Sequence, residues 1–302
     1  MRISEALRTR RPFFSFEFFP PQDDAGMQDL FDTIATLGSL RPAYVSITYG
    51  AGGSTRARTI DISKRIQNEI GLTVMSHITC VSASKRHLRE LFADLQKAGI
   101  ENIMALRGDA PRDQSDFVAD PNGFSYASEL IGMLRREFDF CNGAACYPEI
   151  HPQAASAEDD MKHLAGKVAA GAEFLVTQIC FDNDTYFRFV ERARAAGITV
   201  PILPGIWPIT NYKQIARIAS LCGSQLPPKL LAELEAREHE PEAVKELGVS
   251  YATLQATDLL QRGAPGIHFY TLNKSPATRA VVSALMAATA WRPAPRTGVY
   301  LT

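Results

Sequence analysis

The chain has 302 residues, of which 46% are hydrophobic, and its 32 basic and 33 acidic side chains leave a net charge of −1. This length predicts one large domain or two small ones, and the balanced charge without a basic run argues against nucleic acid or an anionic membrane as partner. No apolar segment is long enough to span a bilayer, and the N-terminal stretch is a poor signal peptide because Glu17 and Pro20-Pro21 interrupt it.

The cysteines are scattered and show no CxxC spacing. An odd number of isolated thiols in mostly apolar contexts indicates reduced core cysteines, not a disulfide framework or a zinc site. We therefore expect a cytoplasmic protein. The five positions are Cys80, Cys141, Cys146, Cys180 and Cys222.

Strand-like and helix-like segments alternate along the whole chain. After a short helix at 4–10, strands are expected at 13–19, 43–49, 73–80, 102–106, 143–147, 173–180, 200–206 and 266–270. Helices are expected at 24–40, 56–70, 84–98, 126–138, 157–170, 184–196, 211–221, from the Pro227-Pro228 break to about 262, and at 276–290. The remaining residues, 291–302, form a Pro-rich tail.

Eight strands that alternate with helices predict parallel βα units with right-handed crossovers. Eight units in this length favour a closed (β/α)₈ TIM barrel over an open doubly wound sheet. We expect one domain over residues 1–302, with the helix at 4–10 capping the bottom of the barrel.

The first strand carries a single carboxylate in an aromatic setting. Alternation places Phe14, Phe16 and Phe18 on one face and Ser15 and Glu17 on the other. Desolvation there is expected to raise the pKa of Glu17 and keep it protonated near neutral pH, as a general acid requires. The alternative is a strand-end glutamate that reaches water or pairs with an arginine.

Polar side chains occupy nearly every expected strand end, although the strand bodies are apolar. In a barrel of this kind the chemistry lies where strands end and βα loops begin, so the pattern indicates an enzyme. The residues are Glu17, Thr48, Tyr49, His77, Arg107, Asp109, Tyr147, Glu149, His151, Gln178, Trp207, Tyr270 and Asn273.

Two local motifs leave alternatives open. The stretch Gly50-Ala-Gly-Gly-Ser-Thr55 could hold a phosphate with backbone N–H groups, but it lacks the Walker lysine and is equally consistent with a plain turn. Arg107-Gly108-Asp109 could present a guanidinium and a carboxylate to a ligand, with Gly108 allowing close approach. The alternative for this motif is an internal salt bridge.

A metal site is a further possibility that the sequence does not favour. His77 and His151 with the carboxylates of Glu17, Asp109 and Glu149 could hold zinc or iron. No local His-x-His or His-x-x-x-His pair supports such a site, so no metal is expected.

The carboxylates of Glu17 and Asp109 could instead serve a glycosidase or another hydrolase or lyase that needs no cofactor. Only Trp207 and Trp291 are available to stack on sugars. Aromatic residues at the strand ends could also flank a flat conjugated ring or simply pack the barrel.

The strand-end segments together resemble methylenetetrahydrofolate reductase of the bacterial type, in chain order and over nearly the whole chain. The length fits the catalytic barrel alone, so we expect no C-terminal regulatory domain of the eukaryotic kind. The segments are Phe14-Ser-Phe-Glu-Phe-Phe-Pro-Pro21, Ser46-Ile-Thr-Tyr-Gly-Ala-Gly-Gly-Ser-Thr55, His77-Ile-Thr-Cys80, Leu106-Arg-Gly-Asp109, Tyr147-Pro-Glu-Ile-His-Pro152, Thr177-Gln178, Pro204-Gly-Ile206 and His268-Phe-Tyr-Thr-Leu-Asn273.

The resemblance implies a (β/α)₈ barrel that binds FAD tightly and reduces 5,10-methylenetetrahydrofolate to 5-methyltetrahydrofolate. NADH or NADPH would reduce the flavin and leave before the folate binds in its place, in a ping-pong order. Glu17 falls on the general acid that protonates the departing folate nitrogen, and Asp109 on a second catalytic carboxylate near flavin and pterin. Relatives form homo-oligomers, which is the expectation here.

The resemblance also assigns binding residues. Folate contacts fall on Gln178, Gln214 and Lys274. FAD contacts fall on Thr48, Tyr49, His77, Arg107, Gly108, Asp109, Ala127, Tyr147, His151, Asp160 and Lys167.

Three positions depart from the family pattern. His163 stands where an asparagine is expected and Gly166 where an arginine is expected, both on the helix that handles the adenosine diphosphate end of FAD. Ile218 stands where an aromatic ring can stack on folate or nicotinamide.

Overall fold

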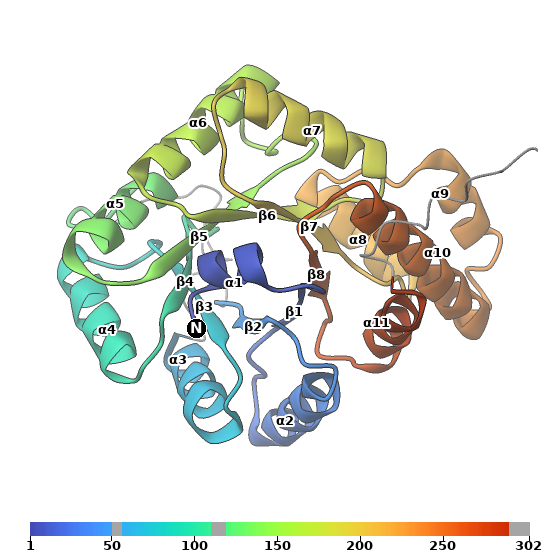
Figure 1. Ribbon diagram of the computed structural model, residues 1–302, viewed down its shortest axis with the longest axis horizontal. Coiled ribbons are helices and arrows are strands. Elements are labelled where there is room, and N and C mark those ends of the chain that lie inside the picture. The colour runs from blue at the N-terminus through green and yellow to red at the C-terminus, as the bar shows by residue number, and fades with distance from the viewer. Residues whose placement is uncertain (50–55, 110–118, 290–302) are drawn as a thin grey trace, which may run out of the picture.

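The computed structural model describes residues 1–49, 56–109 and 119–289 (Figure 1). The candidate phosphate loop at 50–55 and the Pro-rich tail at 291–302 lie outside the described residues, as does Trp291.

Eight parallel strands close into a barrel in the order β1 to β8, with β8 paired to β1. The predicted (β/α)₈ fold is therefore confirmed. The strands are β1 (Phe14–Phe18), β2 (Tyr44–Ile47), β3 (Val74–Thr79), β4 (Asn102–Leu106), β5 (Cys141–Cys146), β6 (Phe174–Ile179), β7 (Ile202–Ile206) and β8 (Ile267–Tyr270).

The helices surround this barrel (Figure 1). They are α1 (Ile3–Thr9), α2 (Asp24–Gly38), α3 (Arg56–Arg65) with its π-helical continuation η2 (Ile66–Ile70), α4 (Lys85–Lys97), α5 (Ala127–Glu137), α6 (Ala157–Ala170), α7 (Asn183–Ala195), α8 (Tyr212–Cys222), α9 (Pro228–Glu235), α10 (Pro241–Gln261) and α11 (Pro276–Ala288).

The helical region expected from the Pro227-Pro228 break to about 262 is confirmed, but it is divided into two helices. The chain forms α9, a short turn, and then α10, which begins with Pro241 in its first turn. Proline fits the first turn of a helix because its missing N–H has no intrahelical acceptor there.

The β1 strand alternates as predicted. Phe14, Phe16 and Phe18 belong to the main core between barrel and helices, which also contains Leu30 and Ile34 of α2. Ser15 and Glu17 face the opposite way, toward the barrel interior, where their partners are polar.

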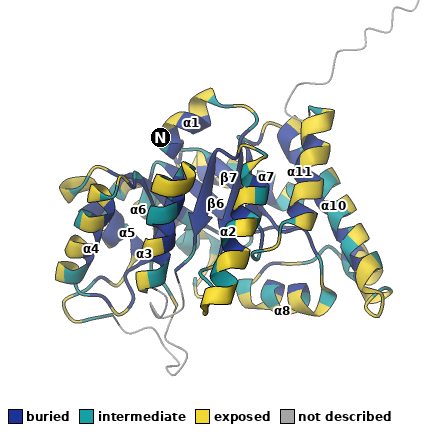
Figure 2. Ribbon diagram, turned by 90° about the horizontal axis from the view of Figure 1, so that it is seen from below, coloured by how far each residue is buried: buried dark blue, intermediate teal, exposed yellow. Residues whose placement is uncertain are grey.

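The N-terminal helix α1 closes the bottom of the barrel, which is the end where the strands begin and which points upward in Figure 2. Its buried Ile3, Ala6 and Leu7 pack in one cluster with Phe13, Tyr44 and other interior residues. The Ile3 N–H donates to Asn102 Oδ1 at 2.8 Å, and the Ser4 hydroxyl donates to Glu173 Oε2 at 2.8 Å. The predicted cap is therefore confirmed.

A second cluster under α8, α9 and α10 buries Trp207 with Ile209 and Leu234. Gly248 lets α10 approach this cluster, because a Cβ there would lie 1.9 Å from the Ile209 carbonyl oxygen. Trp207 therefore packs the scaffold that follows β7. Among the described residues, no helix combines the length and apolar character that crossing a membrane requires.

Shortening a cap side chain should destabilise the barrel. Leu7→Ala removes a side chain that is 3% exposed, so we expect the free energy of unfolding to fall by about 2–4 kcal/mol in urea denaturation. The control Arg8→Ala changes an exposed position of the same helix and should cost less than about 0.5 kcal/mol. Equal effects of the two changes would contradict a packed cap.

Candidate active site

Glu17 is the centre of a buried polar group inside the barrel. Its side chain lies between β8 and β2, because the strand register pairs Glu17 with Tyr270 and with Ser46. One carboxylate oxygen, Oε2, lies 3.3 Å from His268 Nε2 and 3.5 Å from His77 Nε2, and the Ser46 hydroxyl donates to it at 3.5 Å. Glu17 is 6% exposed, so these neighbours replace its hydration.

The expected upward pKa shift of Glu17 is wrong for this structure. Burial does raise its pKa, but the hydrogen bond from His268 and the interactions with His77 and Ser46 outweigh burial, so the pKa lies below the ordinary value. The carboxyl group is therefore ionised at neutral pH in this structure. The prediction that this carboxylate is buried is confirmed. Its closest neighbours, however, are imidazole rings and not the phenylalanine rings of β1.

His268 is the site residue that the sequence reasoning missed. Its Nδ1 lies 2.8 Å from the Ser15 hydroxyl and its Nε2 faces Glu17, so one imidazole joins two inward side chains of β1. The signal was available in the alternation of β8, where His268 and Tyr270 share the inward face. Barrel closure between β8 and β1 then brings these side chains beside Ser15 and Glu17.

A separate cavity of about 420 Å³ opens between β4, β5, α5 and α6. Eight of the eleven residues assigned to FAD line it, although they come from four different elements and their loops. They are Arg107, Gly108, Asp109, Ala127, Tyr147, His151, Asp160 and Lys167.

The charged and aromatic groups of this cavity are held by short contacts. Lys167 Nζ donates to the Ala145 carbonyl at 2.9 Å, and burial lowers its pKa. Asp160 Oδ2 accepts from the His151 N–H at 3.0 Å, and the His151 ring meets the Tyr147 ring edge-on at 4.5 Å. Burial raises the pKa of Tyr147 to about 12, so its hydroxyl stays protonated.

The Arg107-Gly108-Asp109 motif lines the cavity, and contacts within the protein hold its first two residues in place. Arg107 Nη2 donates to Gln153 Oε1 at 2.6 Å, and its Nε donates to the Gly108 carbonyl at 3.2 Å. Gly108 has φ +89°, and a Cβ there would lie 2.7 Å from Val81. Glycine is therefore required by backbone conformation and protein packing at this position.

The remaining FAD-assigned residues lie on the other side of the barrel mouth. Tyr49 is buried at the end of β2, and the Thr48 carbonyl accepts from the Thr59 hydroxyl at 3.0 Å. His77 is 7% exposed, and its Nε2 has no hydrogen-bond partner among the described residues. The Tyr270 hydroxyl donates to the Thr177 carbonyl at 2.7 Å, and burial raises its pKa well above the ordinary value.

The three folate-assigned residues do not line the cavity. Gln178 Oε1 accepts from the Ile179 N–H at 2.9 Å, beside an irregularity in the β6–β7 register. Gln214 and Lys274 are exposed, on α8 and after β8. Their roles stay predictions.

Of the three departing positions, only His163 lines the cavity. Its ring stacks on Tyr126, with ring centroids 6.2 Å apart. A Cβ at Gly166 would meet nothing within 4 Å, so there is open space beside this position, where the resemblance predicted an arginine. Ile218 packs against the cluster that contains Trp207.

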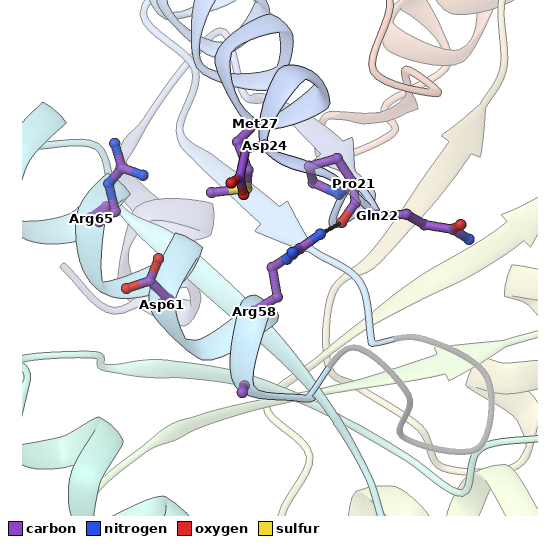
Figure 3. Close-up of a pocket in the computed structure, with 8 residues that line it drawn as sticks. Pro21, Gln22, Asp24, Met27, Arg58, Asp61 and Arg65 are labelled. Atoms are coloured by element: carbon purple, nitrogen blue, oxygen red, sulfur yellow. Dashed lines mark hydrogen bonds between the residues drawn. The ribbon is translucent and has the colours of Figure 1, made fainter.

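A larger groove of about 860 Å³ lies outside the barrel mouth, between α2 and α3 (Figure 3). Arg58 spans it and donates through Nη1 to the Pro21 carbonyl at 2.7 Å. None of the predicted site residues lines this groove, so the smaller cavity is the candidate site. The described residues contain no group of three or more His, Cys, Asp or Glu side chains placed to hold a metal.

The family model for methylenetetrahydrofolate reductase matches residues 2–286. The chain belongs to the methylenetetrahydrofolate reductase family. The resemblance drawn from the strand-end motifs is thereby confirmed.

Named relatives of this family share more than a third of their aligned residues with the chain. The 5,10-methylenetetrahydrofolate reductase of Pectobacterium carotovorum is 39% identical over 271 residues, which cover 90% of this chain and 89% of the relative. The Escherichia coli enzyme of the same name is 38% identical, with 90% of each chain covered. Methylenetetrahydrofolate reductase (NADH) 1 of Arabidopsis thaliana is 39% identical over 283 residues, and this chain spans only about half of that relative's length (48%).

Among solved structures, an uncharacterized Clostridium thermocellum protein that binds two copies of 5-methyl-5,6,7,8-tetrahydrofolic acid superposes with a TM-score of 0.63. The superposition covers 95% of this chain and 99% of that one at 13% sequence identity. This likeness concerns the fold alone.

Stability should depend on pH through His77. Burial lowers its pKa while Glu17 partly offsets the effect, so the unfolded chain binds a proton that folded His77 does not. The contribution of neutral His77 to stability is complete above about pH 6.5, the pKa of histidine in the unfolded chain. It is lost as the pH falls through the lower pKa of His77 in the folded protein.

We expect the free energy of unfolding to fall more steeply between pH 7.5 and 5 in the wild type than in His77→Gln, by up to about 1.4 kcal/mol per pH unit. Denaturant titrations across this range measure the slope. His239→Gln, at a side chain that is 86% exposed, should keep the wild-type slope. A slope unchanged in His77→Gln would show that His77 does not titrate in this way.

Proposed function

We propose that the chain reduces 5,10-methylenetetrahydrofolate to 5-methyltetrahydrofolate with electrons from NADH or NADPH passed through FAD. The proposal is supported by family membership and above all by one observation: eight residues assigned to FAD line a single cavity between β4, β5, α5 and α6. A cytoplasmic location, which the five free cysteines favour, and a homo-oligomeric state both stay predictions.

The residues around the cavity fit FAD. Arg107 and Lys167 offer N–H donors for a diphosphate, and the open space beside Gly166 admits further ligand atoms. An anion beside Lys167 would also favour its charged form, which burial alone disfavours. On the opposite side of the mouth, buried His77 Nε2 faces Glu17 Oε2 at 3.5 Å but makes no hydrogen bond among the described residues, so a polar ligand atom there would satisfy it.

The chemistry that bound FAD supplies is hydride transfer from the nicotinamide to the folate. The protein holds the two substrates in turn at one mouth, which is the ping-pong order, while Asp109, Gln178, Gln214 and Lys274 contact the folate. Glu17 donates a proton to the folate nitrogen whose departure opens the methylene bridge to an iminium. Glu17 must first take up that proton, and the folate favours uptake because covering the mouth removes water from the carboxylate.

Glu17→Gln should separate the two half-reactions. The amide keeps the size of the side chain but cannot give up a proton, so we expect flavin reduction by NADH within about 3-fold of wild type and flavin reoxidation by methylenetetrahydrofolate slower by about 10²–10⁴-fold. Anaerobic stopped-flow absorbance measures both rates. Loss of both half-reactions would make Glu17 a structural residue.

Lys167→Met should weaken FAD binding, because it removes the buried ammonium group of the cavity. We expect the ratio of flavin to protein after purification to fall and the dissociation constant to rise at least about 10-fold, the size of one charge-assisted hydrogen bond. The matched control Lys162→Met lies on the same helix at an exposed position and should retain flavin. Retention of flavin by a folded Lys167→Met protein would place FAD elsewhere.

A further inference from the structure

Tyr44 lies at the inner end of the polar group that contains Glu17. It is on β2, two residues before Ser46 and therefore on the same face of the strand, and it is 0% exposed. Its ring stacks on the His268 ring with centroids 5.9 Å apart and an interplanar angle of 17°. Its hydroxyl lies 3.4 Å from His268 Nδ1, the same nitrogen that the Ser15 hydroxyl approaches at 2.8 Å.

The hydroxyl groups of Tyr44 and Ser15 determine which nitrogen of His268 carries hydrogen. Each hydroxyl has one hydrogen to donate, and the acceptor that both of them face is His268 Nδ1. When Nδ1 accepts, the Ser15 hydroxyl donates to it at 2.8 Å and the Tyr44 hydroxyl at 3.4 Å shares the same acceptor, so both hydrogens have one.

The other tautomer leaves a donor without an acceptor. If Nδ1 carried hydrogen, it would donate to Ser15 Oγ, and the Tyr44 hydroxyl would lose its acceptor, because it has no other hydrogen-bond partner among the described residues. An unsatisfied buried donor is costly, so this tautomer is disfavoured. Tyr44 itself stays protonated, because burial raises the pKa of its hydroxyl well above the ordinary value.

We infer that Tyr44 is a positioning residue that fixes His268 in the tautomer with hydrogen on Nε2, so that His268 presents a donor to Glu17. The consequence for the reaction rests on the proposed function, in which Glu17 is the acid of the folate half-reaction. A fixed donor at 3.3 Å stabilises the ionised carboxylate and so sets the pH at which Glu17 takes up its proton.

The other titratable groups that face this pair lie on neighbouring strands. His77 of β3 lies 3.5 Å from Glu17, and Tyr270 of β8 meets the His268 ring edge-on at 5.2 Å. Cys141 of β5 lies within electrostatic range of Tyr44. None of these groups donates to His268 Nδ1 among the described residues, so Ser15 and Tyr44 act on the tautomer from the Nδ1 side, while the ionised Glu17 favours the same tautomer from the Nε2 side.

Tyr44→Phe tests the inference, because it keeps the stacked ring and removes only the hydroxyl. Ser15 can then accept from Nδ1–H, and the tautomer with a free Nε2 lone pair becomes accessible. In ¹⁵N NMR spectra of histidine-labelled protein, with His268→Gln used for assignment, we expect wild-type His268 to show a hydrogen-free Nδ1 and Tyr44→Phe to show mixed tautomers. In the folate half-reaction, we expect the alkaline limb of the pH profile to move up by about 0.5–1 pH unit, the size that one hydrogen bond supports.

Tyr186→Phe is the matched control, because that buried hydroxyl donates to the Ile202 carbonyl at 2.8 Å, away from His268. It should lower stability and leave both the His268 resonances and the pH profile unchanged. Unchanged resonances and an unchanged profile in Tyr44→Phe would overturn the inference. A protein that binds no flavin would defeat the proposed function, and the NMR spectra would still decide the role of Tyr44.

Discussion

The structure depends on keeping one carboxylate charged inside a barrel. Glu17 is almost fully covered, and a buried charge is tolerated only when partners replace its water. Two imidazoles and a hydroxyl from three neighbouring strands supply that replacement, and closure of the barrel is what brings them together. The fold and the chemistry of the mouth therefore rest on the same pairing of β8 with β1.

The barrel mouth combines two different environments. On one side Glu17, His268, Ser15 and Tyr44 form a closed group in which short contacts satisfy nearly every polar atom. Toward β4 and β5 an open cavity carries charged and aromatic groups that are held in place from behind, as Lys167 is by the Ala145 carbonyl. A site for proton transfer needs the first kind of environment, and a site that binds a large cofactor needs the second.

Local signals predicted the elements well wherever caps were explicit. Strand β4 at 102–106 and helix α6 at 157–170 have the expected bounds, and α6 begins at the Ser156 cap and ends before Gly171. The partners of Glu17 were beyond such signals, because His268 is 251 residues away in the chain. Because His268 was not expected beside Glu17, burial was the one effect considered. The predicted direction of the Glu17 pKa shift was therefore wrong. Eight of the eleven assigned FAD positions do gather in one cavity, since the family motifs carry long-range information that periodicity lacks.

The most direct test of the account is a visible spectrum of the purified protein under anaerobic conditions, recorded after adding NADH and again after adding methylenetetrahydrofolate. We expect a flavin band that bleaches with the nucleotide and returns with the folate, with 5-methyltetrahydrofolate as the product. A band that bleaches and does not return with the folate would contradict the proposed substrate. A protein without any flavin band, even after incubation with FAD, would contradict the central claim and leave only the barrel.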